Sequence, residues 1–579
     1  MAIVAHRREE SNVASVAESG VPRWLAEWLP ALLVLAVGVC GRLPALTSWW
    51  CLDDWGQLAR AAGYLPGAPD LPARWLSQHA WWSLTWPPFG LDAAAHAWSR
   101  IFLHALGAVA VSRIAMRVAL SPLAQLAAGV LFAATPVAFT PLYWASGVQE
   151  LLGGALALWA VERWLAARRR DVLIACALGA GAIVSKESAL GLPLLFGALA
   201  WAGRGKEGGH PRWQWSAAAV LLLAAILETS LVAGHFATGV RDPYATGGFL
   251  VMLGNLGKFG WWLPTPVHYF TAQMTWPKAI LGLLFLAAWG AGGIWSWRRG
   301  RRLALVTWCC ALASLAPALP LVHQARPYLA YVAAACGALA IASLLPARSR
   351  PQIAVMLVIA LTAIGWSQAT MRGRIGRLDV DGRPADPIVR AMQLSRESAQ
   401  ELTEAIAVAG LRDEPLVIYQ AHLSTPRDAA DGAQGDQSAA KSPRHGALSG
   451  SMGASLVCGN GSAVEWTGSL LEIPDNAVVI CERAKGFQPW GTTHEALRYA
   501  AALFVVAGRY DDAVAHLARA AEIAGGRPLV FPAENRIGLP ANALAMLQEK
   551  FDRHLIAKAI KKEISGEAFL AYSGFLARR

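Results

Sequence analysis

The stretch Trp49-Trp50-Cys51-Leu52-Asp53-Asp54-Trp55 directly follows the first long apolar segment of the chain, Leu29–Leu46. Tryptophan favours the interface between a bilayer and water, so we expect this stretch at the edge of a membrane. The adjacent carboxylates Asp53 and Asp54 are suited to act as a base on substrates that approach from one side. Because aspartate also caps helices well, the rest of the chain has to decide between a functional pair and a helix start.

Composition indicates a helical membrane protein. Of 579 residues, 55% are hydrophobic and 16% are charged, and the mean hydropathy is +0.37. Soluble domains carry roughly 25% charged residues. Apolar runs recur between Leu29 and Ala369, and a helix needs about 20 residues to cross a bilayer. We therefore expect a polytopic α-helical membrane protein.

The net charge of +12 belongs to the apolar half of the chain. Up to Gly373, 28 Lys and Arg oppose 15 Asp and Glu, whereas from Arg374 onward 23 oppose 24. A nucleic-acid-binding protein would concentrate its basic residues on one folded domain. Here they lie in short loops, which is the positive-inside pattern, so we exclude nucleic acid as a partner. The clusters are Arg113/Arg117, Arg163 with Arg168–Arg170, Arg204/Lys206/Arg212, Arg298–Arg302 and Arg348/Arg350.

The basic loops predict about eleven crossings. The segment Phe249–Phe270 would place Arg298–Arg302 outside if it crossed, and Lys258, Pro264 and Pro266 also weaken it as a span. We therefore predict that this segment is interfacial or re-entrant. The predicted crossings lie near Leu29–Leu46, His96–Val118, Pro122–Tyr143, Gly147–Leu165, Asp171–Ser185, Ala189–Ala202, Trp215–Phe236, Ala279–Trp297, Leu303–Val322, Pro327–Leu345 and Gln352–Ala369.

This topology predicts three parts. Residues 1–23 form a cytoplasmic tail, and residues 24–372 form the membrane domain with a first outer loop over 47–96. Residues 373–579 form an extracytoplasmic domain, and twelve crossings with a cytoplasmic C-terminal domain is the alternative. The outer face then gathers Asp53, Asp54, Glu150, Lys186, Glu187 and the segment His323–Tyr328. Charged residues near membrane depth are costly and by default mark a functional site.

Five groups of short stretches follow one another along the chain: Leu52-Asp53-Asp54-Trp55, Phe89–Asp92 with Phe102–Leu106, Tyr143-Trp144 with Gln149–Leu152, Ser185–Ser188 with Leu192-Pro193, and Arg326-Pro327-Tyr328-Leu329. In this order they resemble the C-type (GT-C) membrane glycosyltransferase superfamily. The most similar branch is that of the protein O-mannosyltransferase-like proteins with a C-terminal tetratricopeptide (TPR) domain. At Gln149 the chain departs from relatives that carry an arginine-containing loop.

The resemblance implies a polytopic GT-C fold and an inverting hexosyltransferase of the cell membrane. Its donor would be a polyprenyl phosphate that carries a mannose-like hexose, and its acceptor a protein, lipid or glycan on the outer face. Inverting transfer needs a base that takes the proton of the acceptor hydroxyl, and Asp53 matches the position of that base. Asp54 then binds a divalent cation, orients the acceptor or shares the proton.

Arg326 is the best candidate to hold the departing lipid phosphate. A guanidinium fork binds phosphate oxygens bidentately, and His323 and Tyr328 would add hydrogen bonds. The structural alternative is that Arg326 extends to the interface from a helix end.

Three further charged residues leave two interpretations open. Lys186 and Glu187 form a structural ion pair, or Lys186 assists in binding the phosphate. Glu150 is a second acidic group near the sugar, or it stabilises a helix N-terminus. The cofactor is left unknown, because no His and Cys spacing typical of a metal site appears in the sequence.

The C-terminal domain is predicted to be a soluble α/β domain. In an oxidising compartment its two cysteines, Cys458 and Cys481, are expected to pair. The expected elements are a helix over Pro387–Ala409, strands over Pro415–Gln420 and Ala477–Cys481, a mobile linker over Thr425–Gly453 and a TPR-like helical hairpin over Ala496–Gly525.

Two other classes of function stay open. A lipid or polysaccharide transporter or flippase would show inverted repeats and broken helices in matching halves, and the sequence has no clear internal symmetry. A membrane scaffold with a TPR-like binding tail and a dead catalytic site would not need the aspartate pair. We therefore expect a glycosyltransferase.

Overall fold

The computed structural model is mostly helical and divides into two compact units. The first unit comprises Met1–Trp50 and Arg60–Met392, and the second comprises Cys51–Ala59 and Gln393–Arg579. The structure describes residues 23–65, 74–166, 168–202, 212–236, 245–265, 275–300, 302–345, 353–410, 414–420, 443–459, 464–483, 486–525, 529, 532, 541–561, 563–573 and 575–576.

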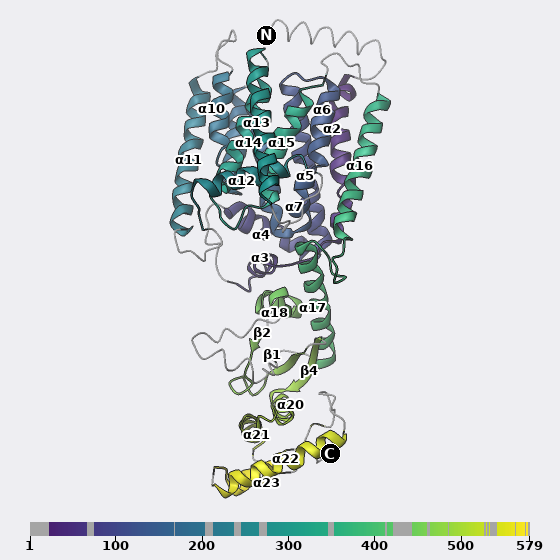
Figure 1. The fold of residues 1–579 in the computed structure, drawn as a ribbon, viewed down its shortest axis with the longest axis vertical. Coiled ribbons are helices and arrows are strands. Elements are labelled where there is room, and N and C mark those ends of the chain that lie inside the picture. The colour runs from purple at the N-terminus through teal and green to yellow at the C-terminus, as the bar shows by residue number, and fades with distance from the viewer. Residues whose placement is uncertain are drawn as a thin grey trace. The chain divides into compact units, whose positions relative to one another are not determined.

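The first unit is a bundle of helices (Figure 1). Most of the turns at one end of the bundle are short helices of the 3-10 type, written η, and η3 is a π-helix. Its elements are α2 (Arg23–Cys40), η1 (Leu43–Thr47), η3 (Trp75–Ala80), α4 (Trp81–Phe89), α5 (Ala93–Arg117), α6 (Pro122–Ala133), η4 (Pro136–Ala138), α7 (Phe139–Tyr143), η5 (Ala145–Gly147), α8 (Val148–Ala166), α9 (Arg169–Ile183), η6 (Glu187–Ala189), α10 (Leu192–Ala202), α11 (Arg212–Phe236), α12 (Phe249–Trp262), α13 (Trp276–Arg298), α14 (Leu303–Leu315), η7 (Ala316–Ala318), η8 (Pro327–Ala330), α15 (Tyr331–Ala342) and α16 (Ile353–Ile375).

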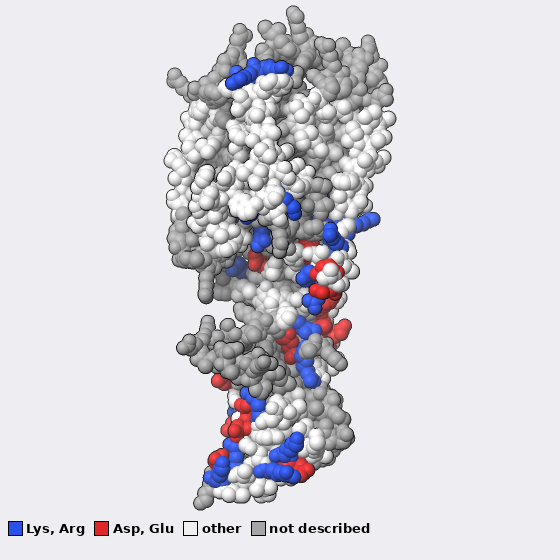
Figure 2. Space-filling model, viewed as in Figure 1, with Lys and Arg blue, Asp and Glu red and all other residues white. Residues whose placement is uncertain are grey.

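Five helices among the described residues are long and apolar enough to cross a membrane, which confirms the prediction of a helical membrane protein. They cover Trp28–Thr47, Ala93–Arg117, Pro122–Tyr143, Trp276–Arg298 and Ile353–Ile375. Large apolar side chains such as Leu284 and Leu361 are exposed on them, as expected of helices that face lipid. Figure 2 shows a broad surface without Lys or Arg over the middle of the bundle. Eleven crossings remain a prediction.

Polar side chains inside the bundle bind backbone groups that the helices leave unpaired. Arg42 is buried and donates to the carbonyl oxygens of Ala133 and Thr135, at 3.0 Å and 2.7 Å. Arg100 is also buried and donates to the carbonyl oxygen of Leu142 at 3.0 Å. The last carbonyls of a helix have no partner within it, so these arginines stabilise the ends of α6 and α7.

Ion pairs define one end of the bundle. The fully buried carboxylate of Glu162 contacts Arg117 at 2.8 Å, Arg163 at 2.8 Å and Arg113 at 3.9 Å. These residues lie at the C-terminal ends of α5 and α8, so the two helices run in the same direction. We call this the basic end. The N-terminus of α8 and the short helices η4 to η8, several of which contact one another, lie at the opposite end.

The second unit contains a four-stranded sheet with the order β2-β1-β3-β4. Strand β1 pairs in parallel with β2 and β3, while β3 and β4 are antiparallel. All five residues of β1 are buried, as is typical of a parallel strand that is covered on both faces. Its elements are α3 (Asp53–Ala61), the later part of α17 (Pro387–Ala409), β1 (Leu416–Gln420), α18 (Pro443–Ala447), α19 (Ser451–Cys458), β2 (Val464–Thr467), β3 (Val478–Arg483), β4 (Gly486–Thr492), α20 (Thr493–Val506), α21 (Tyr510–Ile523), α22 (Ala541–Ile560) and α23 (Gly566–Tyr572).

Most of the elements predicted for the C-terminal domain are confirmed. The helix over Pro387–Ala409 is α17, the two predicted strands are β1 and β3, and two helices, α20 and α21, cover the predicted hairpin, whose TPR-like character remains a prediction. A capping box, in which Thr492 and Glu495 each accept from the other's backbone N–H, begins α20. Strands β2 and β4 were not predicted, because Pro and Gly interrupt β4 and β2 is only four residues long.

One prediction for this domain was wrong, and two others differ in part from the structure. By its contacts the chain divides after Met392, and the segment Cys51–Ala59 groups with the second unit; the membrane boundary at residue 372 remains a prediction. The predicted linker Thr425–Gly453 lies outside the described residues up to 442, but its last part forms α18 and the start of α19. Cys458 and Cys481 are both thiols: Cys481 packs in the buried core of the sheet, whereas Cys458 ends α19.

Candidate functional site

A network of charged side chains lies where η6 meets the start of α8. The Nζ atom of Lys186 lies 3.4 Å from Glu150 Oε1, 3.5 Å from Glu187 Oε2 and 3.4 Å from Gln149 Oε1. Arg74, at the start of η3, donates to Glu187 at 2.7 Å. The structure therefore brings together three of the predicted site residues, Glu150, Lys186 and Glu187.

The close approach of α9 and α8 makes this network possible. Gly153 faces Lys186, and a Cβ at position 153 would lie 3.0 Å from the Cβ of Lys186. The η3 segment is held there by Ser77, which donates to the carbonyl oxygen of Ser185 at 2.6 Å. Small residues let helices approach closely in membrane proteins, and here they bring a buried lysine onto the first turn of α8.

The network has the composition of a structural ion cluster. It holds two cations and two carboxyl groups, and the three donors of the Lys186 ammonium face three acceptors. Of the two interpretations of Lys186, this arrangement favours the ion pair. Glu150 starts α8 and also accepts from Ser188 at 3.4 Å, so it serves the cluster as well as the helix N-terminus.

Glu187 is ionised at neutral pH. Burial raises the pKa of this carboxyl, but the charges of Arg74 and Lys186 more than offset this effect and lower its pKa to about 2. Its interaction with Arg74 therefore persists at any pH near neutrality and is lost only as the pH falls through about 2.

A second group of cations lies beside η8. Arg326 precedes η8, whose Tyr328 packs edge-on against Trp144. The positive charge of Arg326 acts on Lys258 of α12, and α12 contacts η8. Lys258 donates to the side chain of Asn255 at 2.8 Å. Two cations whose charges act on each other favour the binding of an anion.

Lys258 is a candidate that the sequence analysis did not assign. It was treated only as a charge that weakens Phe249–Phe270 as a span. Asn255 fixes its position, because its amide donates to the carbonyl oxygens of Leu319 and Leu321 at 2.9 Å and 2.8 Å. The signal in the sequence was a lysine inside an apolar stretch, which by itself marks a functional site. His323 lies in the loop before η8 and is exposed.

The aspartate pair lies on α3, in the second unit, and the two residues differ in their surroundings. Asp54 is fully buried, and its Oδ2 accepts from the backbone N–H of Cys51 at 2.9 Å. Asp53 is exposed. This contact supports the helix-start interpretation for Asp54, whereas the function of the exposed Asp53 remains a prediction.

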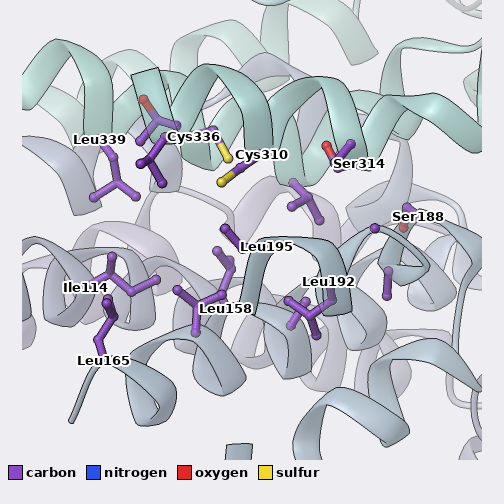
Figure 3. A pocket seen from close by; sticks show the side chains of 18 of the residues that line it. Ile114, Leu158, Leu165, Ser188, Leu192, Leu195, Cys310, Ser314, Cys336 and Leu339 are labelled. Atoms are coloured by element: carbon purple, nitrogen blue, oxygen red, sulfur yellow. The ribbon is translucent and has the colours of Figure 1, made fainter. Parts of the chain in front are cut away.

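An apolar cavity lies among α5, α8, α10, α14 and α15 (Figure 3). Its walls are mainly Leu, Val, Ile and Ala, and Figure 3 shows the sulfur atoms of Cys310 and Cys336 close together in one wall. Ser188 lines one end of the cavity and donates to Glu150. The apolar cavity therefore adjoins the charged network.

Within the described part of the chain, no group of three or more His, Cys, Asp or Glu side chains is placed to hold a metal ion. A metal role for Asp54 remains a prediction.

The comparisons with known proteins identify no relative. No protein-family model matches the chain, and no curated protein matches its sequence. The function is therefore argued from the chemistry of these sites.

Proposed function

We propose that the chain is a membrane glycosyltransferase that moves a hexose from a polyprenyl phosphate to a protein, lipid or glycan acceptor. The observation that carries the proposal is the cavity whose apolar walls end at Ser188, beside the buried network of Glu150 and Lys186. The apolar walls suit part of a lipid tail, and Glu150 beside the end of the cavity is proposed to lie near the sugar; the phosphate is proposed to bind at other residues. A polyprenyl phosphate-linked sugar has both parts.

The proposed binding group for the donor phosphate is the pair Lys258 and Arg326. The support is that the charge of Arg326 acts on Lys258, so that a phosphate diester would interact favourably with both residues. Arg326 offers a planar fork for two phosphate oxygens, and Lys258 offers a point charge from the neighbouring helix. His323 and Tyr328 flank Arg326 in the sequence and are proposed to add hydrogen bonds.

The proposed base is Asp53. Its carboxylate takes the proton of the acceptor hydroxyl while the acceptor oxygen bonds to the anomeric carbon. The bond between that carbon and the phosphate oxygen breaks, and the electron pair leaves with the polyprenyl phosphate. Attack from the face opposite the phosphate inverts the anomeric configuration. Asp54 holds the start of α3, and its contact with Cys51 supports this role.

We also propose the GT-C architecture of eleven crossings with the C-terminal domain on the extracytoplasmic side. Helix α12 has 14 residues, about 21 Å at 1.5 Å per residue, which is shorter than the ~30 Å hydrocarbon core. Where they meet, α12 and α13 run in the same direction, because Gly257 approaches Ala279 and Gly260 approaches Gly282. Both facts support a re-entrant segment, which enters the membrane and returns to the same side.

The hairpin of α20 and α21 is proposed as a single TPR-like repeat.

The position of the C-terminus tests this topology. Without a crossing at α12, a reporter enzyme that is active only outside the cytoplasm and is fused after Arg579 should be active, because the positive-inside loops then all fall on one side. The same reporter fused after Arg302 is the control and should be inactive. Activity of a cytoplasmic reporter after Arg579 would instead favour twelve crossings.

Replacement of the two cations tests the phosphate site. Arg326→Ala should weaken donor binding by about 1.5–3 kcal/mol, the range of a charge-assisted hydrogen bond, and Arg326→Lys should weaken it less. Lys258→Met should lower donor affinity in the same direction, whereas Lys278→Met on α13 is the matched control. The measurement is the KM for a polyprenyl-phosphate sugar. Normal donor affinity in both Arg326 variants would leave Arg326 as an interface anchor.

Asp53→Asn should abolish transfer in a protein that still folds and binds the donor. Asparagine keeps the shape of aspartate but cannot accept the proton, and general bases contribute roughly 10²–10⁴-fold. Asp54→Asn should have a milder effect, seen in the thermal stability as well as the rate, because its side chain contacts Cys51. Full transfer activity of Asp53→Asn together with loss of activity in Asp54→Asn would indicate that Asp54 is the base. Activity of the double variant would reject the mechanism.

A further inference from the structure

The helix that carries the aspartates packs within the C-terminal unit through one tryptophan. Trp55 is fully buried, and its indole Nε1–H lies 3.1 Å from Ser395 Oγ and 3.0 Å from the carbonyl oxygen of Ala447. Ser395 belongs to α17 and Ala447 ends α18. A single side chain therefore joins α3 to two helices that lie hundreds of residues later in the chain.

The turn between α18 and α19 is shaped around this tryptophan. Gly453 donates its N–H to Leu448 at 2.9 Å, and a Cβ at position 453 would lie 2.9 Å from Trp55 Cδ2 and 2.3 Å from the Leu448 carbonyl oxygen. Only glycine leaves room for the indole ring there. The turn between α18 and α19 therefore packs closely around the side chain of Trp55.

A second contact fixes the residue that precedes the aspartates. Ser449 Oγ donates to the carbonyl oxygen of Leu52 at 2.8 Å. Leu52 and Ser449 both have positive φ angles, 53° and 50°, in a region that side chains other than Gly, Asn and Asp rarely adopt. Such conformations persist when the surrounding contacts impose them, and they cluster at functional sites. The contact with Ser449 of the C-terminal unit therefore fixes the backbone conformation before Asp53.

We infer that Trp55 and Ser449 are positioning residues for Asp53, and that the C-terminal unit belongs to the catalytic apparatus instead of serving only to bind partners. The inference rests on the proposed function. Trp55 is two residues from Asp53 in the first turn of α3, so rotation or displacement of the indole moves the carboxylate directly. Removal of these contacts changes the turnover rate, because a reacting group misplaced by about 1 Å costs on the order of 10²-fold.

The test combines a rate with a measure of docking that does not depend on activity. Cys51 is buried beside α3, so its labelling by a maleimide, located by mass spectrometry of the full-length protein in detergent, reports release of the helix. Trp55→Phe keeps the ring but removes its N–H, and Ser449→Ala removes one hydrogen bond. Trp490→Phe is the matched control, because Trp490 is buried in the core of the same unit against Tyr419 and Tyr499.

We expect Trp55→Ala to lower kcat on the order of 10²-fold with an unchanged KM for the donor, and to expose Cys51 to the label. Trp55→Phe and Ser449→Ala should lower kcat by about threefold to tenfold, and Trp490→Phe should leave kcat and Cys51 labelling as in the wild type. If Trp55→Ala does not fold, the kcat values of Trp55→Phe and Ser449→Ala test the positioning role. Normal kcat in both of them would overturn the positioning role. If the wild type transfers no sugar, the proposed function fails, while Cys51 labelling still reports whether Trp55 holds α3 in place.

Discussion

A charge inside an apolar helical bundle is stable only when polar groups surround it. This constraint accounts for the surroundings of the buried charged residues in the first unit. Arg42 and Arg100 are tolerated because they bind the carbonyls at the ends of α6 and α7. Glu162 is tolerated because three arginines surround it. Lys186 is tolerated because Gln149, Glu150 and Glu187 face it. Lys258 binds Asn255 and differs from these residues in that the charge of a second cation, Arg326, acts on it.

These groups differ in their proposed roles, which are structural for the ion clusters and ligand-binding for Arg326 and Lys258. In the network of Lys186 and Arg74, carboxyl groups match the cations in number, so the charges hold η3, η6 and α8 together. The charge of Arg326 acts on Lys258, and we propose that an anionic ligand binds at these two residues. The apolar cavity that ends at Ser188 is proposed to hold part of the lipid tail. We therefore propose that the donor binds at Arg326 and Lys258, and that the network of Lys186 has a structural role.

The sequence was sufficient for the features that follow from local pattern. The length of the apolar segments predicted the long helices, and short apolar runs rich in β-branched residues predicted β1 and β3. The grouping of Glu150, Lys186 and Glu187 followed from placing the basic loops on one side. The role of Trp55 could not be predicted, because it depends on Ser395, Ala447 and Gly453, which lie far away in the chain. For the same reason the last part of the predicted linker, residues 443–453, was not recognised as structured: its Gly and Ser residues are typical of a linker, yet Gly453 is small so that an indole ring fits against it.

The central claim is that the chain transfers a hexose from a polyprenyl phosphate. The most direct measurement incubates the purified full-length protein with a panel of polyprenyl-phosphate sugars and simple acceptors, and follows sugar transfer and the anomeric configuration of the product. The account predicts transfer from at least one donor, with inversion at the anomeric carbon and release of polyprenyl phosphate. Binding of the donors without transfer, or their movement across a vesicle membrane with the sugar still attached, would contradict it and favour a transporter.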